Sequence, residues 1–186
     1  FRFVDELADA GNKLFLDLKL HDIPETVGRA VRNLRSRRAH FVTVHYDRRV
    51  LEAACRERGT LGILAVTVMT SVDAADLRDQ GFAAGTDPAD LVLARAKSAC
   101  DLGCDGVIAS PLEARRIRSA VGPKLAIVTP GIRPAAVEDD QRRVATPRDA
   151  FENGADYIVV GRPLRDAPDP RAAADAIQAT IAGLFG

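Results

Sequence analysis

The sequence predicts an α/β fold built on a parallel sheet, and three observations support this prediction. Six short runs of apolar and β-branched residues recur along the chain, and segments with apolar residues at helical spacing lie between them. The connections between these segments are short, as in βα units. The apolar runs are nearly continuous, which is typical of strands covered on both faces. The predicted strands are Leu14–Lys19, Phe41–His45, Gly62–Val68, Gly106–Ala109, Leu125–Thr129 and Tyr157–Val160.

Helices are expected before the first strand and after each of the six strands. Residues 1–11 have the pattern of the last turns of an amphipathic helix, with Gly11 where a helix commonly ends. Aspartates spaced three residues apart, beginning at Asp73, indicate the exposed face of a short helix in a loop. The remaining expected helices are Pro24–Leu34, Arg49–Arg58, Pro88–Leu102, Leu112–Val121, Thr146–Asn153 and Pro170–Leu184.

Composition restricts the class of protein. The 186 residues are 47% hydrophobic and 28% charged, as in a globular protein of one domain. Basic and acidic residues number 26 each, so the net charge of zero argues against binding to nucleic acid or to an anionic membrane. No apolar run approaches the roughly 18 to 20 residues that cross a bilayer. Three cysteines are too few for a disulfide scaffold, which predicts the cytoplasm.

Two architectures fit six βα units. One is a doubly wound open sheet, and the other is an eight-stranded (β/α)8 barrel whose first two units are outside this sequence. The helical pattern at the very start of the chain favours the barrel. We therefore expect residues 1–186 to form a single (β/α)8 (TIM) barrel domain that is incomplete at its N-terminus and supplies strands three to eight.

Charged residues gather at the carboxyl end of the first predicted strand. Asp17 and Lys19 alternate along the strand and so point to the same side, and Asp22 follows just beyond it. Only four of the 26 basic residues are lysines, so a lysine within an apolar strand is notable. An ammonium can donate a proton, whereas a guanidinium effectively cannot. Spacing alone leaves a catalytic pair and a structural ion pair equally open.

The last two predicted strands are followed by loops suited to an anion. Arg133 follows the fifth run, and Gly161 and Arg162 follow the sixth. Glycine lets the backbone approach an anion closely, and arginine offers planar donors that match phosphate oxygens. Loops after strands seven and eight of barrels commonly bind phosphate. If the sixth run is strand eight, the first is strand three.

These motifs together resemble the orotidine 5′-phosphate decarboxylase family. The resemblance covers the whole chain, with the motifs in the family's order, and includes the stretch from Leu64 to Ser71, which resembles the fifth strand and its loop. The motifs are Asp17-x-Lys19-x-x-Asp22-Ile-Pro-x-Thr26, Thr129-Pro-Gly-Ile-Arg133-Pro, Asp140-Gln141-Arg142 and Val160-Gly161-Arg162-Pro163.

The resemblance implies a reaction and residues that perform it. Orotidine 5′-monophosphate would be decarboxylated to uridine 5′-monophosphate in pyrimidine biosynthesis, with Lys19 protonating C6 and Asp17 beside the substrate's carboxylate. A fixed ammonium stabilises negative charge as it develops on the ring carbon. No cofactor and no metal ion is implied. Asp22 would reach the neighbouring site of a homodimer.

The resemblance also implies which residues bind the substrate. Ile23 and Thr26 belong to the binding set, with Thr26 helping to hold the ribose of the neighbouring site. Thr70 and Ser71 match the region that meets the pyrimidine. The phosphate would be held by Arg133, Gln141, Gly161 and Arg162.

Two other functions stay open. Magnesium-dependent 3-keto-L-gulonate 6-phosphate decarboxylases and hexulose-phosphate synthases share the Asp-x-Lys-x-x-Asp element, although Arg133 and Gln141 favour the nucleotide. The other alternative is a barrel that binds a nucleotide without catalysis.

The family also carries an Asp on its first strand and a Lys on its second, and neither position is in this sequence. We therefore expect the 186-residue chain alone to be inactive or unfolded.

Overall fold

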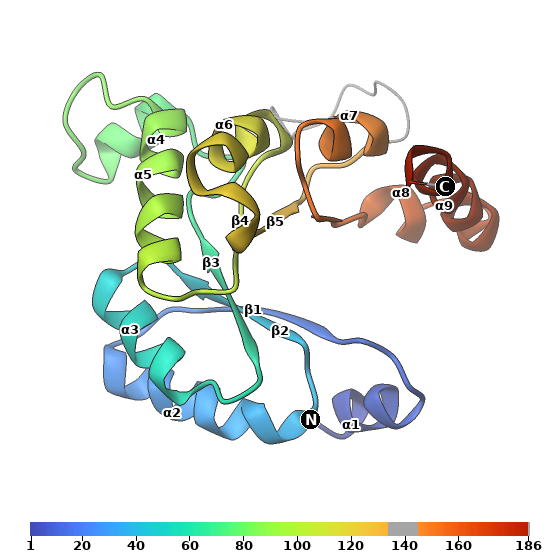
Figure 1. The fold of residues 1–186 in the computed structure, drawn as a ribbon, viewed down its shortest axis with the longest axis horizontal. Coiled ribbons are helices and arrows are strands. Elements are labelled where there is room, and N and C mark those ends of the chain that lie inside the picture. The colour runs from blue at the N-terminus through green and yellow to red at the C-terminus, as the bar shows by residue number, and fades with distance from the viewer. Residues whose placement is uncertain (134–144, 186) are drawn as a thin grey trace. The chain divides into compact units, whose positions relative to one another are not determined.

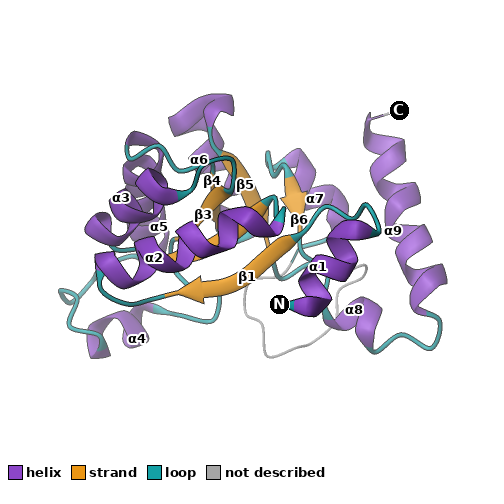
Figure 2. Cartoon of the chain, turned by 90° about the horizontal axis from the view of Figure 1, so that it is seen from below, coloured by secondary structure: helices purple, strands orange, loops and turns teal. Residues whose placement is uncertain are grey.

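A computed structural model describes residues 1–133 and 145–185 of the chain. The chain divides into two compact units. The first unit comprises Phe1–Thr67 and Ala94–Ile108, and the second comprises Val68–Leu93 and Ala109–Gly186. Each unit is described separately below, and Figures 1 and 2 show the elements of both.

The first unit contains four strands, and each is parallel to its neighbour in chain order. The strands are β1 (Phe15–Leu20), β2 (Phe41–His45), β3 (Gly62–Val66) and β4 (Gly106–Ile108). The side chains of the two middle strands form much of the core, because β2 and β3 are buried almost throughout. The helices are α1 (Arg2–Asp9), α2 (Pro24–Leu34), η1 (Arg35–Arg37), α3 (Arg48–Glu57) and the C-terminal part of α5 (Pro88–Asp101).

Helices α2 and α3 pack side by side in this unit (Figure 1). Helix α2 begins at a proline, whose fixed φ suits the first turn, and buries Val27 and Val31. A Cβ on Gly28 would lie 3.7 Å from the Cβ of Ala53, so this glycine allows the two helices to approach closely. We conclude that the apolar spacing seen in the sequence is the buried face of α2.

The second unit contains the strands β5 (Ala126–Thr129) and β6 (Tyr157–Ile158), which are parallel to each other. Buried Ile132, Ala150 and Ala155 form a small core there, with Ile158 and Val160 packed against it. The helices are α4 (Ala74–Asp79), the N-terminal part of α5, α6 (Pro111–Val121), η2 (Gly122–Lys124), α7 (Pro147–Glu152), α8 (Arg162–Arg165) and α9 (Pro170–Phe185).

A Gly-x-Asp turn leads into β4. Gly103 has φ +79°, a conformation that glycine adopts without strain, and ends helix α5. The carboxylate of Asp105 accepts the N–H of Ile63 at 2.8 Å and pairs with the guanidinium of Arg58. The backbone N–H of Asp105 in turn donates to the Ile63 carbonyl at 3.0 Å. This turn therefore joins the starts of β3 and β4.

The second unit repeats this turn at the start of β6. Gly154 has φ +94°, and the Asp156 carboxylate accepts the N–H of Ile127 at 2.7 Å. Arg118 of α6 pairs with Asp156, as Arg58 does in the first unit. Because both turns lie at the amino ends of strands, opposite the carboxyl ends where barrel enzymes place their chemistry, we interpret them as stabilising features.

The predicted elements agree well with the structure. All six strands and all the expected helices are present, and Asp73 caps α4 by accepting the backbone N–H of Asp76. The third and sixth strands end two residues before their predicted ends, at Val66 and Ile158. The sequence did not indicate α8, a single turn that tolerates a proline in its first positions. In the described part of the chain, no helix has the length and apolar character of a membrane span.

Candidate active site

The predicted catalytic pair lies on β1. The ammonium of Lys19 donates a hydrogen bond to Oδ2 of Asp17, and the two groups form an ion pair. Both side chains are nearly half exposed. An exposed ion pair by itself contributes little to stability, so stability does not account for a lysine in this strand.

The strand is irregular at this pair. Leu16 of β1 pairs with Val42 of β2, and Leu20 pairs with Val44, so three residues of β1 oppose one residue of β2. Lys19 has φ +46°, a left-handed conformation that is uncommon outside glycine. Bulges of this kind redirect side chains and occur often beside active sites.

The residue opposite the bulge is Thr43, which sequence reasoning missed. Its hydroxyl accepts the backbone N–H of Lys19 at 2.8 Å and donates to Oδ1 of Asp17 at 2.9 Å. Thr43 is fully buried. The sequence held one indication of this position. Thr43 stands two residues before His45, the last residue of the predicted strand, so the two side chains share a face near the carboxyl end of the strand.

Two histidines and an arginine lie near the end of β2. The rings of His21 and His45 are 5.1 Å apart, and the guanidinium of Arg95 lies 5.0 Å from the centre of the Tyr46 ring. Burial lowers the pKa of His45, and the charges of His21, Lys19 and Arg95 lower it further. The Asp17 carboxylate acts in the opposite direction but is the smallest of these influences, so His45 is neutral near pH 7.

Asp22, Ile23 and Thr26 lie where β1 leads into α2. Oδ1 of Asp22 accepts the N–H of Ile23 at 2.6 Å, and Ile23 precedes the first turn of the helix. Asp22 and Ile23 are exposed, whereas Thr26 is partly buried in the first turn. A shallow pocket of about 570 Å³ opens at this loop. It is lined by His21, Asp22, Ile23, Pro24, Asp47, Arg49 and Val50.

The predicted pyrimidine-binding residues lie in the second unit. Thr70 and Ser71 stand in a turn that is closed by a 2.9 Å hydrogen bond from the Val72 N–H to the Met69 carbonyl. Thr70 is partly buried and Ser71 is exposed. Of the two residues, Ser71 is therefore the more accessible to a ligand.

Arg133, predicted to bind phosphate, also lies in the second unit. Its side chain is buried and donates to the carbonyl of Ile132 at 2.9 Å, while its backbone N–H donates to the carbonyl of Ala145 at 2.9 Å. Gln141, from the same predicted set, lies outside the described residues. Among the contacts described for Arg133 are therefore backbone groups that precede and follow it in the chain, at Ile132 and Ala145.

Gly161 and Arg162 begin the short helix α8. The carbonyl of Gly161 accepts the N–H groups of Leu164 and Arg165, each at 3.0 Å. Arg162 is partly buried and Gly161 is exposed. The backbone at Gly161 is therefore accessible to a ligand, as the phosphate prediction requires.

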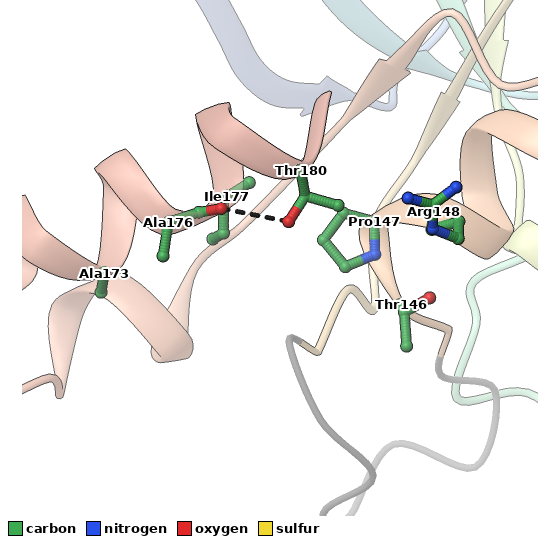
Figure 3. A pocket seen from close by; sticks show the side chains of 7 residues that line it. All are labelled: Thr146, Pro147, Arg148, Ala173, Ala176, Ile177 and Thr180. Carbon is green, nitrogen blue, oxygen red and sulfur yellow. Dashed lines mark hydrogen bonds between the residues drawn. The ribbon is translucent and has the colours of Figure 1, made fainter. Parts of the chain in front are cut away.

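The second unit also has a groove between α7 and α9 (Figure 3). It measures about 500 Å³, and Pro147 and Thr180 face it from the two helices. None of the predicted site residues lines it. Within residues 1–133 and 145–185, no three His, Cys, Asp or Glu side chains gather as a metal site would need.

Comparison with known proteins identifies the family. Residues 1–177 match the family described as Orotidine 5'-phosphate decarboxylase / HUMPS family. The chain belongs to this family. It is 54% identical over 187 residues to orotidine 5'-phosphate decarboxylase of Methylococcus capsulatus, covering 100% of this chain and 76% of that protein. Orotidine 5'-phosphate decarboxylase of Rhodopseudomonas palustris strain HaA2 is 52% identical, with coverage of 96% and 77%.

Solved structures confirm the fold class. The chain superposes on orotidine 5'-phosphate decarboxylase from Lactobacillus acidophilus with a TM-score of 0.82 and 39% identity, covering 95% of this chain and 78% of that one. The enzyme from Pyrococcus horikoshii OT3 gives a TM-score of 0.70 at 30% identity, with coverage of 94% and 78%. The α/β class with TIM-barrel relatives is thus as predicted, whereas the numbering of the strands as three to eight stays a prediction.

Proposed function

We propose that this protein is an orotidine 5′-phosphate decarboxylase, which converts orotidine 5′-monophosphate to uridine 5′-monophosphate in pyrimidine biosynthesis. The observation that carries this conclusion is the 54% identity, over the whole chain, to a relative named for that activity. The structure adds a lysine and an aspartate in contact at the carboxyl end of β1, where parallel α/β enzymes place their chemistry.

In the proposed mechanism, Lys19 is the proton donor. Cleavage of the bond between C6 and the carboxylate releases CO2 and leaves an electron pair on C6. The Lys19 ammonium stabilises this charge as it develops and then gives its proton to C6, after which it takes up a proton from water. Asp17 holds the ammonium through the ion pair. In the proposal it also lies beside the departing carboxylate.

The phosphate grip is assigned to Arg133, Gln141, Gly161 and Arg162, and the pyrimidine contacts to Thr70 and Ser71. Phosphate is remote from C6, so its binding energy does not act on the breaking bond directly. It can orient the base against Lys19 and hold the loops around the substrate. The exposed backbone of Gly161 and the adjacent arginine support this assignment.

We also propose that the enzyme is a homodimer. Asp22 and Thr26 would serve the neighbouring subunit's site, together with Ile23. Support comes from Ile23, an apolar residue that is 65% exposed beside the exposed carboxylate of Asp22. Such an apolar residue beside a pocket is suited to burial in an interface. We place the enzyme in the cytoplasm, in keeping with its three free cysteines.

The magnesium-dependent sugar-phosphate enzymes are the second candidate. The family description names HUMPS beside the decarboxylase, but the relatives with 50–54% identity carry the decarboxylase name. The relatives therefore do not favour this alternative, nor a barrel that only binds nucleotides.

The direct test is to mix the full-length gene product with orotidine 5′-monophosphate and follow the loss of the orotate absorbance, with and without a chelator. We expect turnover that the chelator leaves unchanged. Turnover that stops on chelation, or turnover of 3-keto-L-gulonate 6-phosphate instead, would favour the second candidate. Binding of uridine 5′-monophosphate by a folded protein without turnover would favour the non-catalytic alternative.

A further inference from the structure

The bulge in β1 interrupts the regular backbone pairing at Lys19, the proposed proton donor. Between the Leu16–Val42 and Leu20–Val44 pairs, three residues of β1 face Thr43 alone. One residue cannot supply regular backbone partners to three. Lys19 also adopts a left-handed φ of +46°, which costs free energy for a residue with a Cβ.

The hydroxyl of Thr43 supplies hydrogen bonds at this irregular position. The Thr43 oxygen accepts the Lys19 N–H at 2.8 Å, taking the place that a backbone carbonyl has in a regular ladder. The same hydroxyl donates its proton to Oδ1 of Asp17 at 2.9 Å. Since Oδ2 of Asp17 accepts from the Lys19 ammonium, the carboxylate is held at both oxygens. Thr43 thus links the backbone of Lys19 to the carboxylate that holds its side chain.

We propose that Thr43 is a positioning residue for the decarboxylation, an inference that rests on the proposed function. Thr43 is 0% exposed, so it acts through Asp17 and Lys19 rather than on the substrate. Its hydroxyl keeps the carboxylate from rotating and keeps the Lys19 backbone in its bulged conformation. The ammonium is therefore held in place before the substrate arrives, which is the condition for electrostatic stabilisation of the developing charge.

This role requires the hydroxyl and not only the volume of the side chain. Valine has nearly the same shape as threonine but can neither accept nor donate. Thr43→Val would leave the Lys19 N–H without a hydrogen-bond acceptor, and Oδ1 of Asp17 would lose the hydrogen bond from the hydroxyl. Serine retains the hydroxyl and loses only a methyl group. The Val and Ser variants therefore separate the hydrogen bonds from the packing.

The experiment measures kcat, KM and the Kd of uridine 5′-monophosphate for full-length wild type, Thr43→Val and Thr43→Ser. We expect Thr43→Val to lower kcat about 10- to 100-fold, since small displacements of reacting groups have effects of this size, with Kd changed by less than about two-fold. Thr43→Ser should recover kcat to within about three-fold of wild type.

Thr67→Val is the matched control. Thr67 is also buried, and its hydroxyl donates to the Ile108 carbonyl at 2.8 Å rather than to the catalytic pair. It should lose stability much as Thr43→Val does, while kcat stays within about two-fold of wild type. If Thr43→Val does not fold, Thr43→Cys, which offers only a weak S–H, should still lower kcat several-fold.

Three results would overturn the inference. They are an unchanged kcat in Thr43→Val (or in Thr43→Cys, if the valine variant does not fold), a Thr43→Ser variant as slow as Thr43→Val, and an equal loss of kcat in Thr67→Val. Each of these leaves the proposed function intact, because wild-type turnover is measured alongside. A folded wild-type protein without turnover would overturn both.

Discussion

The predicted catalytic pair in the first unit and the predicted phosphate residues in the second differ in the contacts that the structure describes for them. Asp17 and Lys19 are held by side-chain hydrogen bonds from each other and from Thr43 on the next strand. In the second unit, the described contacts of Arg133 and Gly161 are to backbone groups. The side-chain network of the first unit holds one charge at one position, as chemistry at a single bond requires. In the second unit, the exposed backbone of Gly161 leaves room for an anion to approach.

The comparison makes the two regions separable by mutation. Changes at the catalytic pair should alter kcat, whereas changes at the second unit's loops should alter the affinity for phosphorylated ligands. The following predictions test that separation, beginning with the largest effect.

Lys19→Ala should give the largest effect. Removal of the ammonium deletes both the proton donor and the charge that stabilises the transition state, so kcat should fall by about 10³-fold or more. The measurement is single-turnover decarboxylation at saturating substrate. Lys97→Ala, a change of an exposed lysine on α5, is the control and should leave kcat unchanged. Near-normal turnover by Lys19→Ala would contradict the assignment.

Arg162→Ala should mainly weaken substrate binding. A charged hydrogen bond to phosphate contributes about 1.5 to 3 kcal/mol, so KM should rise roughly 10- to 100-fold, with a smaller effect on kcat. Arg165→Ala is the matched control on the same helix, because Arg165 is exposed and pairs with Asp166. If both variants raised KM equally, or neither did, Arg162 would have no special part in binding phosphate.

His45 should make the stability of the protein depend on pH. Burial and neighbouring charges lower the pKa of His45 below 6.5, so the unfolded chain takes up its proton first as the solution is acidified. Stability is complete above about pH 6.5 and falls as pH drops toward the folded-state pKa. Urea unfolding between pH 5 and 8 should show this slope reduced in His45→Gln. The exposed His40→Gln control should keep the wild-type slope, and identical slopes in all three proteins would contradict this account.

The smallest effect concerns two cysteines of the first unit. The sulfur atoms of Cys55 and Cys104 are 3.7 Å apart. The hydrogen bond between the two sulfur atoms and the charge of Arg58 lower the pKa of Cys55, whereas that hydrogen bond and burial raise the pKa of Cys104. Near pH 8, iodoacetamide should therefore modify Cys55 about tenfold faster than Cys104, as measured by peptide mass spectrometry. Equal rates would contradict this prediction.

The sequence predicted the elements because their signals are local. Apolar runs gave β1 to β6, and Pro24 marked the start of α2 to the residue. The Asp-x-Lys-x-x-Asp motif could also be recognised, because its three residues lie within one short segment, and its catalytic role stays a prediction. The family resemblance then added roles that spacing alone left open.

What the sequence did not predict depends on contacts between distant residues. The bulge in β1 follows from its register against β2, and Thr43 lies 26 residues from Asp17. The contact between Cys55 and Cys104 spans 49 residues. A strand pattern has no information on which hydroxyl will face an irregular partner. Such contacts become visible only once the strands are paired.

The central claim is that chemistry and phosphate recognition reside in different regions. The most direct measurement is the ratio of the Kd of uridine to that of uridine 5′-monophosphate, determined by calorimetry for wild type, Lys19→Ala and Arg162→Ala. We expect Lys19→Ala to keep the wild-type ratio and Arg162→Ala to reduce it by about tenfold or more. A fall in this ratio of Kd values in Lys19→Ala, or an unchanged ratio in Arg162→Ala, would contradict the claim.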